Sequence, residues 1–197
     1  SGVVLSFLLG ALSGAALAVL FAPRSGKETR EILGEKLRET ADRGRRLGED
    51  ALEQGVRVKI SSWRRNPQNA LPASAKATGQ YINGVLAKIE SLKAGYDEAV
   101  MLNEQGFITD GSGENLFIVR DGKLTTPPIQ AGCLDGITRG TVLTIARDLG
   151  YDVTEENLVR TDLYNADECF FTGTAAEITP IREVDDRAVG EGHRGPI

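Results

Sequence analysis

A lone lysine and a later carboxylate are the residues of this chain most able to do chemistry. Lys76 stands among small residues in the run Ala-Ser-Ala-Lys-Ala-Thr-Gly, and Asp110 follows 34 residues later in the glycine-rich run Thr-Asp-Gly-Ser-Gly. A lysine amine can hold an aldehyde cofactor as a Schiff base, and such a site also needs a nearby carboxylate. The two segments therefore predict a cofactor-dependent enzyme.

Composition limits what else the chain can be. Its 197 residues, 41% hydrophobic with a formal charge of -5, suffice for one ordinary domain and an appendage. A sequence pI near 5.1 argues against a general nucleic-acid binder. Cys133 and Cys169 match no metal or redox spacing, which favours free thiols over a disulfide. The single histidine, His193, lies so near the end that we expect it at the surface.

Strands are indicated at three places in the chain. Residues 56–60 alternate as a half-buried strand, and residues 99–102 and 115–119 are apolar runs of strand length. Asp121-Gly122, between Val119 and Leu124, is a typical hairpin turn.

Two helices are predicted between and after these strands. The first covers residues 81–94, has Val85, Leu86, Ile89 and Leu92 along one face and ends at Gly95. The second covers residues 138–149, with Gly150 as its stop. Its expected buried residues are Val142, Leu143, Ile145, Ala146 and Leu149. Because helices and strands mix without strict alternation, the fold class is predicted to be α+β.

The first 46 residues differ from the rest. Residues 3–22 carry no charge and are long enough for a transmembrane helix, with a cleaved signal peptide as the alternative. Basic residues follow at positions 24, 27 and 30, so we expect residues 1–23 to anchor a chain that lies in the cytoplasm. Residues 24–46 are predicted to form a charged helical stalk. Residues 7–46, with Leu-Phe-Ala-Pro-Arg-Ser-Gly-Lys-Glu-Thr-Arg at 20–30, resemble small bacterial YtxH-like proteins.

Residues 47–197 contain six ordered blocks of distinctive sequence. The blocks are residues 47–55, Ser61-Ser62-Trp63, the run around Lys76, Gly-Ser-Gly-Glu-Asn-Leu-Phe at 111–117, Leu-Asp-Gly-Ile-Thr-Arg at 134–139 and Phe-Thr-Gly-Thr-Ala-Ala-Glu-Ile-Thr-Pro at 171–180. Together they resemble the branched-chain amino acid aminotransferases, which are pyridoxal-phosphate enzymes of fold type IV. The resemblance implies the large domain of such an enzyme, shortened at its C-terminal end and without the family's small N-terminal domain.

The resemblance also implies the site residues that act on the ring of the cofactor. Lys76 is the Schiff-base lysine and proton carrier, and Tyr81 hydrogen-bonds the phenolic oxygen of the cofactor. Asp110 faces the pyridine nitrogen, at a position where the family has glutamate, which is one methylene longer.

The resemblance places the phosphate at the start of the second helix. Leu134, Gly136, Ile137 and Thr138 lie there, and helix N-termini favour anions. The resemblance makes Thr174 a second phosphate contact and gives the substrate carboxylate the amides of Ala175 and Ala176. Because an anion beside the phosphate would oppose it, Asp135 is expected to face solvent.

The implied activity is transfer of the amino group of leucine, isoleucine or valine to 2-oxoglutarate with pyridoxal 5'-phosphate as cofactor. The implied partners are amino acid and 2-oxo acid substrates and a second copy in a homodimer, without metal or nucleic acid. Two alternatives remain. One is a membrane-anchored, inactive chimera or fragment, and the other is a D-amino acid aminotransferase or aminodeoxychorismate lyase.

Overall fold

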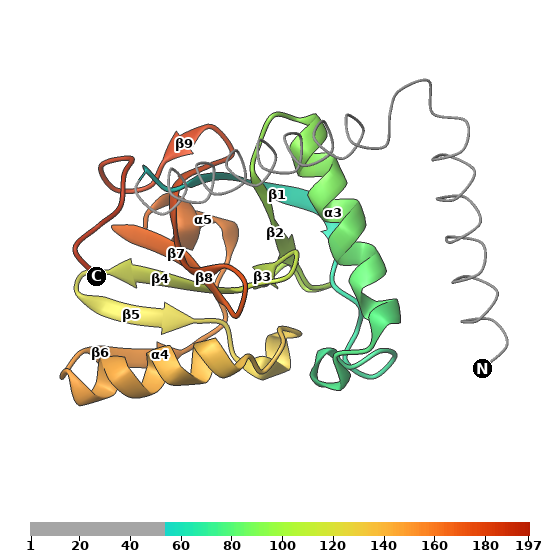
Figure 1. The fold of residues 1–197 in the computed structure, drawn as a ribbon, viewed down its shortest axis with the longest axis horizontal. Coiled ribbons are helices and arrows are strands. Elements are labelled where there is room, and N and C mark those ends of the chain that lie inside the picture. The colour runs from blue at the N-terminus through green and yellow to red at the C-terminus, as the bar shows by residue number, and fades with distance from the viewer. Residues whose placement is uncertain (1–53) are drawn as a thin grey trace, which may run out of the picture. The chain divides into compact units, whose positions relative to one another are not determined.

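A mixed sheet of nine strands organises the part of the chain that the computed structural model describes, residues 54–197 (Figure 1). The strands are β1 (Val56–Arg64), β2 (Glu98–Leu102), β3 (Ile108–Gly111), β4 (Asn115–Arg120), β5 (Lys123–Thr126), β6 (Asp152–Glu155), β7 (Glu168–Gly173), β8 (Glu177–Val184) and β9 (Arg187–Ala188). The helices are α3 (Tyr81–Lys93), α4 (Ile137–Asp148) and α5 (Arg160–Tyr164), with short 3-10 helices η1 (Ala73–Ala75), η2 (Thr78–Gln80) and η3 (Ile129–Ala131).

The strand order is β3-β2-β1-β8-β7-β4-β5-β6, and β9 pairs with β8. Strand β1 runs parallel to β2 and β8, and β5 runs parallel to β6, whereas the other pairs are antiparallel. This mixture agrees with the predicted α+β class, and it places β1, β2 and β3 side by side at one end of the sheet.

Both faces of the sheet are buried. Along β4, Leu116 and Ile118 join the core under α5, whereas Phe117 and Val119 join the core under α4. This alternation follows from the two-residue period of a strand. The ring of Phe117 stacks on Phe170 of β7 with centroids 5.2 Å apart. A run of apolar residues on both faces of the strand is therefore required here, as Leu116 to Val119 show.

Local turn and stop signals in the sequence are confirmed. Asp121 and Gly122, with φ of 52° and 75°, form the hairpin between β4 and β5. Gly95 and Gly150 follow α3 and α4 with positive φ, which glycine adopts without a steric cost. The predicted helices therefore end close to where these two glycines lie in the sequence.

The apolar face of α3 does not lie against the sheet. Val85, Ile89 and Leu92 are largely exposed, and the buried positions are instead the small residues Gly84, Ala87 and Ser91. The reason is close approach, since Ala87 packs on Ala99 and Met101 of β2 and leaves no room for larger side chains. Periodicity located the helix but did not identify its buried face.

Helix α4 shows the same kind of difference. Leu143 and Ala146 are buried and Val142 is half-buried, as expected, but Ile145 and Leu149 are 52% and 70% exposed. The buried face of α4 is therefore narrower than the sequence predicted. A narrow apolar stripe is enough to cover the short strands β5 and β6 beneath this helix.

The predicted membrane span and stalk lie outside the described residues. The boundaries at residues 23 and 47 therefore stay predictions. Within residues 54–197, no helix is long and apolar enough to cross a membrane. Cys133 and Cys169 are free and buried, and His193 is exposed, so these three predictions are confirmed.

Helix α3 owes its position to Gly84, which gives a first prediction. A Cβ added there would lie 2.5 Å from the carbonyl oxygen of Ser112, in the turn between β3 and β4. We expect Gly84→Ala to lower the free energy of unfolding by about 1–3 kcal/mol in urea titrations, despite the better helix propensity of alanine.

Gly140, inside α4, is the matched control because nothing lies within 4 Å of its added Cβ. Gly140→Ala should stabilise the chain by about 0.5–1 kcal/mol. Equal effects of the two substitutions would show that α3 does not depend on this contact.

Candidate functional site

A small cavity lies where the η1–η2 segment, the β3–β4 turn and the loop before α4 meet. Its enclosed volume is about 20 Å³, and 310 Å³ is reached only when the adjoining space open to solvent is included. Its lining residues are Arg65, Ala73, Gln80, Tyr81, Asp110, Ser112, Gly113, Glu114, Asn115 and Leu134. Three of the predicted cofactor residues, Tyr81, Asp110 and Leu134, are therefore brought together although they are far apart in sequence.

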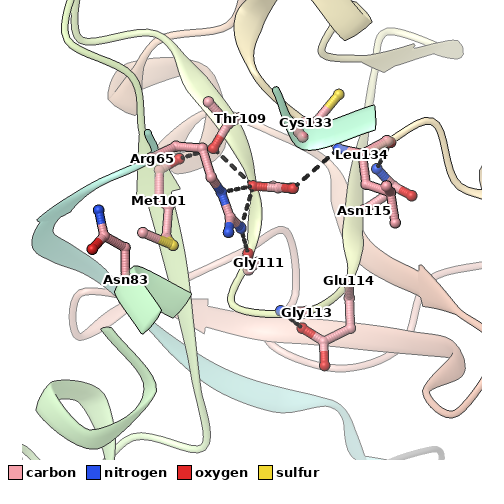
Figure 2. A network of polar contacts seen from close by, with 12 residues as sticks. Arg65, Asn83, Met101, Thr109, Gly111, Gly113, Glu114, Asn115, Cys133 and Leu134 are labelled. Carbon is pink, nitrogen blue, oxygen red and sulfur yellow. Dashed lines mark hydrogen bonds and ion pairs between the residues drawn. The ribbon is translucent and has the colours of Figure 1, made fainter. Parts of the chain in front are cut away.

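Asp110 is buried at the cavity wall and held through one oxygen. Arg65 donates from Nε at 2.9 Å and from Nη2 at 2.6 Å to its Oδ1, and Thr109 donates to the same atom from Oγ1 at 2.8 Å. Its Oδ2 accepts only from the Leu134 amide, at a long 3.4 Å, among residues 54–197. Figure 2 shows Arg65, Thr109 and Leu134 around this carboxylate. One oxygen is fixed, so the other keeps capacity to accept a strong hydrogen bond.

Burial and charge act against each other at this carboxylate. Burial raises the pKa of Asp110, and the Arg65 charge and the hydrogen bonds from Thr109, Arg65 and the Leu134 amide oppose that rise. Arg65 is itself only 7% exposed. A buried pair of this kind is stable only while both partners are present. Aspartate is one methylene shorter than the glutamate that the family has here. Its carboxylate therefore reaches less far, and Arg65 holds it in one place.

Tyr81 and Lys76 lie on the same connecting segment but differ in their surroundings. Tyr81 is the first residue of α3, is half-buried and lines the cavity. Lys76 follows η1 in the left-handed conformation, with φ 46° and ψ 33°, and is exposed. It is not one of the cavity-lining residues. Such a conformation is uncommon for a residue other than glycine and often marks a functional position.

The predicted phosphate residues lie at the start of α4. Gly136 is the residue that precedes this 12-residue helix, Ile137 is exposed and Thr138 is half-buried. The first amides of a helix have no partner within it, so they can bind an anion. A Cβ at Gly136 would lie 2.1 Å from Oδ1 of Asn115, whose Nδ2 donates to the Leu134 carbonyl at 2.7 Å. Asn115 thus fixes the loop that leads into the helix.

The remaining predicted residues lie in the turn between β7 and β8. Thr174 and Ala175 are exposed, and Ala176 is half-buried with its carbonyl accepting from Oγ1 of Thr179 at 2.7 Å. Gly173 lies beside the Glu114 side chain, which lines the cavity. The turn therefore begins next to the cavity wall. Asp135 is exposed, as expected.

Sequence reasoning missed several residues of this cavity. Arg65 stands two positions after the Ser-Ser-Trp block, and Glu114 and Asn115 lie inside a quoted block, yet none was given a role. Gln80 was missed because a glutamine before a helix carries no local signal. For Arg65 the only available signal was a buried carboxylate that needed a counter-charge.

Removing the Arg65 guanidinium gives a second prediction. Arg65→Met leaves Asp110 buried without its counter-charge, so we expect a loss of about 3–5 kcal/mol in the free energy of unfolding. Arg120→Met is the control, because Arg120 and Asp121 form an exposed pair at 3.8 Å. Adding Asp110→Asn to Arg65→Met should recover part of the loss. Equal stability of Arg65→Met and Arg120→Met would show that the buried Asp110 charge does not need Arg65.

Glu114 gives a third prediction. Its pKa is raised above the ordinary 4.5, first by burial and then by the nearby Glu98 charge. The folded chain thus holds this proton more tightly than the unfolded chain, and stability falls as pH rises through the window between the two pKa values. Glu114→Gln should remove this fall, so the stability of the variant relative to wild type should increase between about pH 4 and pH 8.

Urea unfolding at both pH values measures this difference. Glu156→Gln is the control of opposite sign, because the hydrogen bond and charge of Lys123 lower the pKa of Glu156. An identical pH dependence of wild type and Glu114→Gln would contradict the proposed state of Glu114.

Comparisons with known proteins identify the family. The profile of the amino-transferase class IV family matches residues 24–184, and the match begins inside the segment interpreted as a stalk. The chain is 51% identical to the branched-chain-amino-acid aminotransferase of Pseudomonas aeruginosa over 154 residues, which are 78% of this chain and 50% of that protein. The chain spans about half the length of the curated relatives it matches.

Solved structures agree with the sequence comparison. The crystal structure of the Escherichia coli branched-chain amino acid aminotransferase matches with a TM-score of 0.74 and 49% identity over 75% of this chain and 48% of that one. The branched-chain amino acid aminotransferase of Thermobaculum terrenum, solved in its PLP-form, matches with a TM-score of 0.71 and 43% identity over 73% and 47% of the two chains. The fold, the ordered blocks and the matched length together show that this chain belongs to the class IV aminotransferase family.

Proposed function

We propose that this chain binds pyridoxal 5'-phosphate and transfers the amino group of leucine, isoleucine or valine to 2-oxoglutarate. The observation that carries the proposal is the carboxylate of Asp110, which Arg65 fixes through one oxygen in the wall of a cavity that Tyr81 also lines. The names of the relatives, branched-chain aminotransferases, support the substrate class.

The donors and acceptors around the cavity fit such a cofactor. The free Oδ2 of Asp110 suits a protonated ring nitrogen, and the phenol of Tyr81 suits the phenolic oxygen. The amides of Ile137 and Thr138 at the start of α4, together with the hydroxyl of Thr174, suit a phosphate. When bound, the cofactor supplies an electron-accepting ring that stabilises charge at the substrate α-carbon.

The residues of the chain then have separate tasks. Asp110 holds a proton on the ring nitrogen, because its buried charge favours a cation next to it. Lys76 Nζ would hold the aldehyde of the cofactor and, once free, would be the base and acid that carries the substrate α-proton. The backbone amides of Ala175 and Ala176 orient the substrate carboxylate.

One observation favours a second candidate. Lys76 is exposed and does not line the cavity, so these residues could bind the cofactor and turn it over poorly, as an inactive chimera or fragment would. The D-amino acid aminotransferase and aminodeoxychorismate lyase activities use the same lysine and phosphate contacts, but the compared relatives favour the branched-chain reaction. A homodimer stays a prediction.

A lysine substitution tests the assignment and gives a fourth prediction. With the cofactor added, we expect the wild-type chain to show the absorbance band of a lysine-bound aldehyde and Lys76→Ala to lose it. Lys93→Ala, on the exposed last turn of α3, should keep the band. A band that persists in Lys76→Ala would rule out this lysine.

Leucine-dependent formation of glutamate from 2-oxoglutarate separates the two candidates. The proposed transamination requires this conversion in the wild-type chain and its loss in Lys76→Ala. Cofactor binding without glutamate formation would support the inactive candidate instead.

A further inference from the structure

One carbonyl closes the turn that carries Lys76. The carbonyl oxygen of Ala73 accepts a hydrogen bond from the Lys76 amide at 3.1 Å and another from Nε2 of Gln80 at 3.0 Å. The amide of Ala73 donates to Oε1 of Gln68 at 3.2 Å. Two glutamine side chains therefore hold Ala73, one through its amide and the other through its carbonyl.

The segment between Ala73 and Gln80 is otherwise held by backbone hydrogen bonds within its two 3-10 turns. Residues 74–79 are all exposed, whereas Ala73 and Gln80 are 6% and 5% exposed and both line the cavity. The hydrogen bond from Gln80 joins these two buried ends. Lys76 thus lies on a short exposed loop whose two buried ends are joined directly by the Gln80 carboxamide, in addition to the backbone hydrogen bonds of η1 and η2.

The oxygen of the Gln80 carboxamide is buried and makes no hydrogen bond with the described residues. An unsatisfied buried acceptor costs free energy, and an apolar side chain of the same length would avoid that cost. Reversing the carboxamide would place its oxygen against the Ala73 carbonyl oxygen, and the hydrogen bond between the two residues would be lost. The bond from Nε2 to Ala73 is therefore the one hydrogen bond of the Gln80 side chain within residues 54–197.

We propose that Gln80 is a positioning residue for Lys76, closing the loop so that the lysine amine reaches an aldehyde bound in the neighbouring cavity. The inference rests on the proposed function, in which Lys76 binds the cofactor. In that step the uncharged Nζ attacks the aldehyde carbon, the C=N bond forms, and the carbonyl oxygen leaves as one water. Gln80 takes no part in this exchange and acts through Ala73.

The experiment separates covalent attachment from cofactor binding. Full-length wild type and Gln80→Met are mixed with pyridoxal 5'-phosphate, borohydride supplies hydride to reduce the C=N bond, and mass spectrometry of peptides measures the cofactor fixed on Lys76. Because a small misplacement of a reacting atom slows a reaction strongly, Gln80→Met should slow fixation by about tenfold to a hundredfold. Pyridoxamine 5'-phosphate, which has no aldehyde, should bind both proteins with the same affinity.

Controls make the outcomes distinct. Gln105→Met changes an exposed glutamine and should leave fixation unchanged. If Gln80→Met does not fold, Gln80→Asn, whose carboxamide is one methylene too short to reach Ala73, should slow fixation in the same way.

Three results overturn the claims in different ways. Wild-type fixation away from Lys76, or none, defeats the proposed function itself. Fixation on Lys76 at equal rates in wild type and Gln80 variants defeats only the positioning role. A parallel loss of pyridoxamine 5'-phosphate affinity would make Gln80 a structural part of the cavity and would also overturn that role.

Discussion

The buried ion pair between Arg65 and Asp110 is the interaction on which the site depends. Taking both charges out of water is costly, and the cost is offset only by close, multiple contacts. Arg65 supplies them, since it donates twice to Oδ1 of Asp110 and also to the Gly111 carbonyl, while its own amide donates to Leu102. These contacts join the end of β1 to β3 and hold the Asp110 carboxylate in one position.

Close contacts at two glycines complete the walls around this pair. Gly84 brings α3 against the Ser112 carbonyl, and Gly136 brings the start of α4 against Asn115. Neither contact has room for a side chain. The helix that begins with Tyr81 is thus located by a backbone contact, and the helix whose first amides are proposed to bind an anion by the Asn115 side chain. The cavity geometry follows from the sheet and these two approaches together.

Features set by residues close together in the sequence could be predicted, whereas features set by contacts between distant segments could not. Glycines after helices and the Asp121-Gly122 turn act locally, so the ends of α3 and the β4–β5 hairpin were predictable. The buried face of α3 was not, because Ala99 and Met101 decide it from another element. The role of Arg65 was hidden for the same reason, since its partner lies 45 residues away. The roles of Lys76 and Thr174 came from resemblance and stay proposals.

The two groups that first indicated chemistry lie in opposite environments, and the proposed reaction accounts for the contrast. Asp110 must keep one position relative to a ring nitrogen throughout, and burial with Arg65 provides that. In the proposed reaction, Lys76 would bind an aldehyde, release it and then carry a proton. A lysine fixed within the sheet could not do all three. An exposed loop tied at both buried ends leaves the amine free to change its position while its range stays limited.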